Sequence, residues 1–132
     1  MFTVRVESPE DISAIRRVNE QAFGSPQEAA LVDALREVAR PFVSIVAVED
    51  DQVVGHISFR PVTIDGAGSV RRAMGLAPMA VLPEHQRRGI GSLLARAGLE
   101  ECQQLGCDVV VVLGHPEYYP RFGFRPAGER GL

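Results

Sequence analysis

A strand, a glycine-containing turn, a helix and a second strand follow one another in this chain, and this succession most constrains its fold. Residues 89–105 carry apolar side chains at helical spacing, and Gly106 ends that helix. Residues 108–113 form a continuous β-branched run, which is typical of a strand covered on both faces and beside a parallel neighbour. Because residues 73–82 also indicate a strand, we predict a right-handed crossover that joins two parallel strands.

The rest of the predicted sheet is antiparallel. Alternating or Val- and Ile-rich segments bounded by turn residues indicate short strands joined by hairpins. Pro78 cannot donate a ladder hydrogen bond, so it predicts an edge, a bulge or a break in pairing. The predicted strands are 2–6, 42–48, 53–64 and 73–82, with turns at 49–52 and 65–69.

Two helices are expected between the first and second strands. Ser8-Pro9 and the capping box Ser25-Pro26-Gln27-Glu28 mark where they begin, and Pro41 prevents the second from continuing. Each helix has an apolar stripe that predicts its buried face. For all three helices we expect these inward residues: Ile12, Ile15, Val18 (or Asn19) and Ala22; Ala29, Val32, Leu35 and Val38; Ile90, Leu93, Leu94, Ala97 and either Cys102 or Leu105.

These patterns predict the α/β (α+β) class. The sheet is mixed, with antiparallel N-terminal strands followed by a parallel pair, and helices lie on both faces. A length of 132 residues predicts one domain spanning 1–132.

Composition excludes several classes of function. Fourteen basic and 17 acidic residues give a net charge of −3, so nucleic acid is not expected as a partner. Cys102 and Cys107 are the only cysteines, and the three histidines lie far apart in sequence, so we expect no metal site and no disulfide framework. The N-terminus lacks a signal-peptide pattern and no apolar run approaches about 20 residues, which predicts a cytoplasmic protein without a membrane span.

The turn at residues 86–92 is the most informative motif. A helix that begins directly after a strand leaves its first main-chain N–H groups unpaired and pointing the same way. Together with the helix dipole these groups form an anion site, and glycines at 89 and 91 let a phosphate approach closely. Arg87 and Arg88 add positive charge. The pattern matches neither G-x-G-x-x-G nor G-x-x-x-x-G-K-[ST], which argues against a dinucleotide fold and a P-loop.

Two motifs resemble those of the GNAT superfamily of N-acetyltransferases. The first resembles the acyl-coenzyme A signature Gln/Arg-x-x-Gly-x-Gly/Ala after a "V-x-P" strand end, and the second resembles "F-Y-x-x-x-G-F". Here they read Met79-Ala80-Val81-Leu82-Pro83-Glu84-His85-Gln86-Arg87-Arg88-Gly89-Ile90-Gly91-Ser92-Leu93-Leu94 and Tyr118-Tyr119-Pro120-Arg121-Phe122-Gly123-Phe124. The likeness covers the whole chain and is nearest to bacterial predicted N-acetyltransferases. The family's strands after "G-F" have no counterpart here, which predicts a C-terminally short domain, or an edge that a second copy covers in a homodimer.

The resemblance implies roles for particular residues. The parallel strands would splay around the cofactor, with Pro78 as a local reason. Tyr119 would be the general acid that protonates the leaving thiolate, and the Val81 N–H would polarise the thioester carbonyl. The backbone of Met79, Ala80 and Val81 would pair with the pantetheine arm of coenzyme A. The pyrophosphate would be held by the amides of Arg87, Arg88, Gly89, Ile90, Gly91 and Ser92.

The general base is left open. His56, Glu84, His115 and a water relayed to Glu49 or Asp50 are candidates, and His115 is preferred because it follows the last parallel strand. The expected function is transfer of an acetyl group from acetyl-CoA to a primary amine of a small molecule or peptide. The alternatives are a non-catalytic acyl-CoA-binding module and a generic phosphate-binding α/β domain.

Overall fold

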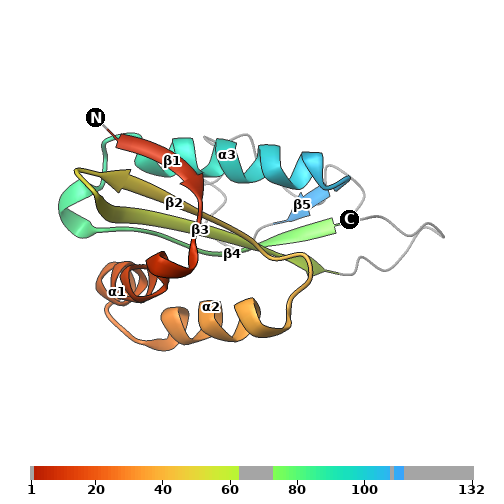
Figure 1. The fold of residues 1–132 in the computed structure, drawn as a ribbon, viewed down its shortest axis with the longest axis horizontal. Coiled ribbons are helices and arrows are strands. Elements are labelled where there is room, and N and C mark those ends of the chain that lie inside the picture. Colours follow the sequence, from red (N-terminus) through yellow and green to blue (C-terminus); the bar gives the residue numbers. More distant parts are fainter. Residues whose placement is uncertain (1, 63–72, 108, 112–132) are drawn as a thin grey trace.

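The computed structural model describes residues 2–62, 73–107 and 109–111, which form a five-stranded sheet between two layers of helices (Figure 1). The strands lie in chain order across the sheet. All neighbours are antiparallel except β4 and β5, which pair in parallel from Ala73–Val109 to Gly75–Val111. The strands are β1 (Phe2–Val6), β2 (Val43–Glu49), β3 (Gln52–Val62), β4 (Ala73–Val81) and β5 (Val109–Val111).

Helices cover both faces of this sheet. Two short 3-10 helices, η1 (Pro9–Asp11) and η2 (Pro83–His85), precede α1 and the turn that leads to α3. In Figure 1, α1 (Ile12–Phe23) and α2 (Gln27–Val38) lie on one face and α3 (Ile90–Gln104) lies on the other. The mixed sheet and the helix between its parallel strands confirm the predicted fold class.

The core confirms most of the expected inward residues, but two were wrong: Val38 is 75% exposed and Leu93 is 42% exposed. Of the alternatives Cys102 and Leu105, Cys102 is the buried one, and Leu105 is 42% exposed. The inward face of α3 is formed by Ile90, Leu94, Ala95, Gly98 and Cys102. This face is shifted toward Ala95 and Gly98, so Leu93 lies beside the contact with the sheet rather than in it.

The two helix starts differ from each other. At the first, Asp11 accepts hydrogen bonds from the Ser8 N–H (2.7 Å) and hydroxyl (3.1 Å), and Arg5 pairs with it; these contacts lower the pKa of Asp11 to about 2, chiefly through Arg5. At the second, the expected capping box is wrong. The Ser25 hydroxyl donates to the Glu28 carboxylate (2.9 Å), and no side chain caps α2.

Pro78 lies where the ladder between β3 and β4 is interrupted. Ile57 pairs with Met79 and Phe59 pairs with Leu76, so Ser58 faces two residues of β4, one of which is Pro78. This is a β-bulge, as the missing proline N–H predicts. The turn at 65–69 and the strand beyond Val111 lie outside the described residues, so the expected splay of the parallel pair stays a prediction.

Gly98 of α3 is required by close packing on the sheet. A Cβ atom there would lie 2.1 Å from Cε2 of Phe59, which is fully buried in β3. Alanine normally favours a helix over glycine by about 1 kcal/mol. Here the overlap outweighs that gain, and we expect Gly98→Ala to lower the free energy of unfolding by roughly 1–3 kcal/mol. Urea unfolding measures this change.

The double variant Gly98→Ala/Phe59→Leu is the control, because leucine removes the ring atoms that would clash. We expect its loss of stability to be smaller than the sum of the two single losses. A Gly98→Ala variant as stable as the wild type would contradict the packing assigned to this glycine.

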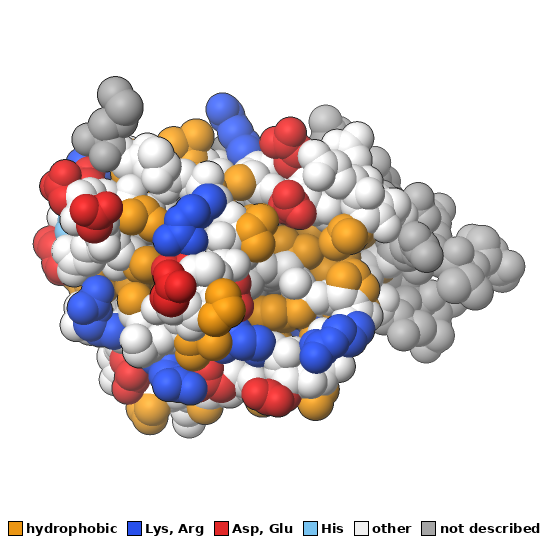
Figure 2. Space-filling model, in the orientation of Figure 1, with side chains coloured by type: hydrophobic (Ala, Val, Ile, Leu, Met, Phe, Trp, Pro, Cys, Tyr) orange, Lys and Arg blue, Asp and Glu red, His pale blue; other side chains and the backbone are white. Residues whose placement is uncertain are grey.

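The surface in Figure 2 carries charges of both signs side by side. Arg16 pairs with Asp33 (2.7 Å), and Arg36 pairs with the same carboxylate (3.0 Å) and with Glu7 (2.9 Å). On the face that Figure 2 shows, basic and acidic side chains are interspersed and do not form one basic patch.

Candidate active site

The turn between β4 and α3 leaves a row of main-chain N–H groups without partners. The first hydrogen bond of α3 runs from the Leu93 N–H to the Gly89 carbonyl (3.2 Å). The amides of Ile90, Gly91 and Ser92 precede it, as expected at a helix start. Within the described residues, the amides of Arg87, Arg88 and Gly89 have no acceptor either.

Two residues of this turn have left-handed backbone conformations. Gly89 has φ +83°, and a Cβ atom there would meet no atom within 4 Å, so the space above the turn is open. Arg87 has φ +64°, which is unusual for a residue other than glycine. The turn therefore combines unpaired amides with open space beside Gly89, as anion sites at helix N-termini do.

The two arginines of the turn behave differently. Arg88 donates to both carboxylate oxygens of Glu49, at 2.7 and 3.1 Å, whereas Arg87 makes no side-chain ion pair within the described residues. The expected positive charge beside the turn is thus supplied mainly by Arg87, since Glu49 compensates that of Arg88.

A cavity of about 420 Å³ adjoins this turn. Its walls come from the C-terminal ends of α1 and β4, from the turn and from the first residues of α3. It is lined by Ala22, Phe23, Met79, Ala80, Val81, His85, Gln86, Arg87, Ile90 and Gly91.

Six of the residues expected to bind the cofactor line this cavity, and three do not. Met79, Ala80 and Val81 reach it from β4, and Arg87, Ile90 and Gly91 reach it from the turn and α3. Arg88, Gly89 and Ser92 lie in the same turn without lining it. Tyr119, the expected general acid, is outside the described residues, as is His115.

The main chain of β4 is open along the cavity. Leu82 donates its N–H to Val54 of β3 (2.9 Å), and successive residues of a strand point to opposite sides, so the N–H and C=O of Val81 point away from β3. The side-chain amide of Gln86 donates to the Val81 carbonyl (3.0 Å), as this direction requires. Since β5 pairs only with Ala73 to Gly75, this edge of β4 has no strand partner among the described residues at Met79–Val81.

Four of the lining residues were not among the expected binding residues: Ala22 and Phe23 of α1, and His85 and Gln86 within the motif. Phe23 ends α1 and is 44% exposed. Nothing near it in sequence indicates a site, because its place at the cavity depends on how α1 packs across β4. Because His85 lies far in sequence from the other two histidines, its residue type did not indicate a binding site.

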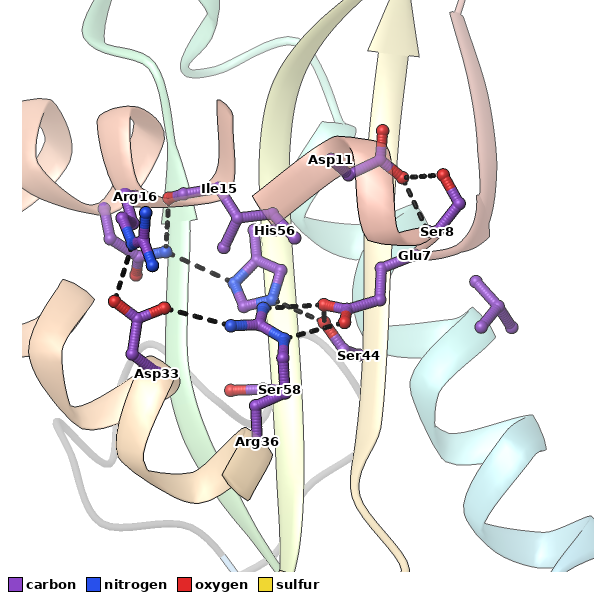
Figure 3. Close-up of polar contacts among 12 residues, drawn as sticks. Glu7, Ser8, Asp11, Ile15, Arg16, Asp33, Arg36, Ser44, His56 and Ser58 are labelled. Atoms are coloured by element: carbon purple, nitrogen blue, oxygen red, sulfur yellow. Dashed lines mark hydrogen bonds and ion pairs between the residues drawn. The ribbon is translucent and has the colours of Figure 1, made fainter. Parts of the chain in front are cut away.

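His56, a candidate base, lies instead in a buried polar network (Figure 3). Ser44 donates its hydroxyl proton to Glu7, so it accepts from Nε2–H of His56 (2.8 Å), and Nδ1 is left to accept from the Asn19 amide (3.3 Å). Glu7 is paired with Arg36. Burial would raise the pKa of Glu7, but hydrogen bonds from Arg36 and Ser44 hold the pKa below its usual value.

Both ring nitrogens of His56 are thus occupied, and the ring is fully buried and does not line the cavity. Burial lowers the pKa of His56 to about 4, against the opposing effect of Glu7. The structure therefore assigns His56 to the core. Glu84 and Asp50 do not line the cavity, and Arg88 holds the pKa of Glu49 below its usual value.

The His56 pKa predicts a pH dependence of stability. Between about pH 6.5 and pH 4 the unfolded chain binds a proton at this site and the folded chain does not, so stability falls as the pH falls. From pH 7 to pH 5 we expect this group to contribute a loss of about 2 kcal/mol. Urea unfolding at both pH values measures the slope, and His56→Gln should reduce it. An unchanged slope in His56→Gln would contradict the assignment.

The described residues contain no group of three or more His, Cys, Asp or Glu residues placed to hold a metal ion. No helix among them has the length and apolar character needed to cross a membrane.

Comparison with known proteins agrees with this geometry. Residues 3–127 match the family model described as an acetyltransferase (GNAT) domain. The chain is 44% identical over 133 residues to the uncharacterized N-acetyltransferase YjhQ of Escherichia coli K12, covering 98% of this chain and 74% of that protein. It is 36% identical over 130 residues to the uncharacterized N-acetyltransferase YhbS of the same strain, covering 98% and 77%.

Two solved structures are similar throughout. A GNAT family acetyltransferase from Brucella melitensis in complex with acetyl-CoA has a TM-score of 0.87 and 42% identity, covering 96% of this chain and 84% of that one. YhbS from Escherichia coli in complex with CoA also has a TM-score of 0.87, with 36% identity and coverage of 97% and 71%. Fold, open turn and relatives together define an enzyme of the acyltransferase class. The chain belongs to the GNAT family of N-acetyltransferases.

Proposed function

We propose that this enzyme transfers the acetyl group of acetyl-CoA directly to a primary amine of a small molecule or a peptide. The observation that carries the proposal is the row of unpaired amides beside a cavity on the open edge of β4. The complexes of the Brucella melitensis enzyme with acetyl-CoA and of YhbS with CoA support this choice of cosubstrate.

The residues of the turn fit the pyrophosphate of coenzyme A. Unpaired amides at the start of α3 and the positive end of its dipole stabilise an anion. The open space above Gly89 lets phosphate oxygens reach them. In this proposal the pyrophosphate is held by the amides of Arg87, Arg88, Gly89, Ile90, Gly91 and Ser92.

The edge of β4 fits the pantetheine arm. Its amide groups can pair with the main chain of Met79 and Val81 as an added strand would. The main-chain groups of Ala80 point toward β3, so Ala80 would take part only by lining the cavity. The cavity beside these residues is also lined by Ala22 and Phe23 of α1. The acetyl end of the cosubstrate and the acceptor would thus lie between β4 and the end of α1.

The chemical roles follow from these positions. When bound, the coenzyme supplies the acetyl group as an activated thioester. The Val81 N–H, which points away from β3, would stabilise negative charge on the carbonyl oxygen. Tyr119 would donate a proton to the leaving thiolate. Because an aliphatic amine with a pKa near about 10.4 is neutral in only about one molecule in 2,500 at pH 7, the acceptor must also lose a proton.

Calorimetry with coenzyme A followed by a thiol-release screen of amines tests the proposal. We expect saturable binding of coenzyme A and amine-dependent release of free thiol from acetyl-CoA. Reactions without amine correct for hydrolysis and for Cys102 and Cys107. Absence of coenzyme A binding would overturn the assignment of the site and favour a generic phosphate-binding domain. Binding without turnover across peptide and small-molecule amines would favour a non-catalytic acyl-CoA-binding module.

The cytoplasmic location, the homodimer and the single domain over 1–132 stay predictions. Light scattering tests the homodimer.

A further inference from the structure

One carboxylate from a distant hairpin contacts His85, just before the proposed phosphate-binding turn, and Arg88 within it. Glu49 ends β2, next to the hairpin turn at Asp50 and Asp51. Its Oε2 accepts from Arg88 at 2.7 Å, and its Oε1 lies 3.1 Å from Arg88 and 3.3 Å from Nε2 of His85. These partners lie 36 and 39 residues further along the chain.

The segment between these two partners carries the unusual backbone. Arg87 has φ +64°, a conformation that residues other than glycine keep only where their surroundings impose it. Glu49 contacts His85 two residues before Arg87, and it is paired with Arg88 directly after Arg87. Nδ1 of His85 is buried without a partner, so the contact with Glu49 is the one polar contact of this ring within the described residues.

Both His85 and Arg87 line the cavity, whereas Glu49 does not. We propose that Glu49 is a positioning residue, which holds the turn from His85 to Arg88 so that its amides converge on the coenzyme A pyrophosphate. This inference rests on the proposed function. It assigns to Glu49 a role different from that of a base, because Glu49 acts only through His85 and Arg88.

The charge of Glu49 and its positioning role predict opposite changes in the affinity for coenzyme A when this carboxylate is removed. A negative charge near an anion site weakens anion binding, so its removal alone should tighten the binding of coenzyme A. If Glu49 instead positions the turn, its removal weakens binding. The variant Glu49→Gln therefore separates the two effects by the direction of the change.

We expect Glu49→Gln to raise the calorimetric Kd for coenzyme A about tenfold, because a bidentate, charge-assisted contact is lost. The KM for acetyl-CoA should rise similarly, while kcat at saturating acetyl-CoA stays within about twofold, since binding restores the turn. A generally damaged fold would lower kcat as well.

The matched control is Asp51→Asn. It removes the same charge from the same hairpin, and asparagine tolerates the positive φ of +64° at that position. We expect its Kd to be unchanged or slightly lower. A second variant, Arg88→Met, should also weaken the binding of coenzyme A. In the double variant Glu49→Gln/Arg88→Met, the rise in Kd should not exceed the product of the two single effects, because both substitutions break the same contact.

Unchanged or tighter binding in Glu49→Gln would overturn the inference. The same holds if Asp51→Asn weakens binding as much as Glu49→Gln does. Failure of the wild-type enzyme to bind coenzyme A would instead contradict the proposed function, so the two failures are distinguishable. Thermal unfolding of each variant shows whether it folds. If Glu49→Gln does not fold, the Kd for coenzyme A is compared instead between wild type and Glu49→Asp, which keeps the charge on a shorter side chain.

Discussion

Gly89→Asp is expected to weaken coenzyme A binding by roughly 10²- to 10³-fold, which corresponds to one added charge a few ångströms from the pyrophosphate. Gly89 is the N-cap of α3 and has φ +83°. The space its side chain would enter is open, so the carboxylate would lie above the unpaired amides and accept hydrogen bonds from them. It would therefore occupy the donors and repel the phosphate at the same time.

Gly89→Asn is the matched control for this prediction. Asparagine has the same shape, tolerates a left-handed backbone and can accept the same hydrogen bond, but it carries no charge. We expect it to weaken binding less than aspartate does. The stability of both variants should lie within about 1 kcal/mol of wild type, because a capping side chain offsets the backbone strain. Calorimetry and thermal unfolding check both expectations. Tight binding by Gly89→Asp would place the anion elsewhere.

Tyr119→Phe is expected to lower kcat by roughly 10²-fold or more while the Kd for coenzyme A stays unchanged. The expectation rests on the match of Tyr119 to the family tyrosine that protonates the thiolate. Without the hydroxyl, the leaving group must depart as a thiolate or take its proton from water. Steady-state kinetics with the best amine of the thiol-release screen, together with calorimetry, measures both quantities.

Tyr118→Phe is the corresponding control, because Tyr118 is expected to pack rather than react. It should keep kcat within a few-fold of the wild type. A Tyr119→Phe variant with full activity would remove Tyr119 from the mechanism, and equal losses in both variants would point to packing of the segment.

The motif from Met79 to Ser92 predicted its own local structure well. The strand end, the turn and the helix are as expected, and Pro78 lies at a bulge. These features depend on residues near each other in sequence: a proline without an N–H, and glycines in the turn. The candidate bases were harder to predict, because the environment of a titratable side chain comes from other elements. In the sequence, His56 occupies a strand position that any polar residue could take. Only its burial against Asn19 and Ser44 shows that its role is structural.

Leu93 also shows that contacts between distant elements decide which residues are buried. Leu93 has the spacing of a core residue in α3, but the sheet meets that helix at Gly98, where Phe59 needs the space. Helical periodicity defines a stripe about 100° wide, and the depth of packing selects which part of it is buried.

The amino-acid sequence by itself determined the order of the helices and strands that the structure describes, the parallel pair and the glycine-containing turn before α3. Each of these follows from side-chain periodicity and backbone preferences over a few neighbouring residues. The tertiary structure alone decided that Phe23 lines the cavity, that His56 is buried and that Glu49 contacts His85 and Arg88. Such contacts join elements far apart in the chain, and their distances depend on how helices and sheet pack, which no local pattern encodes.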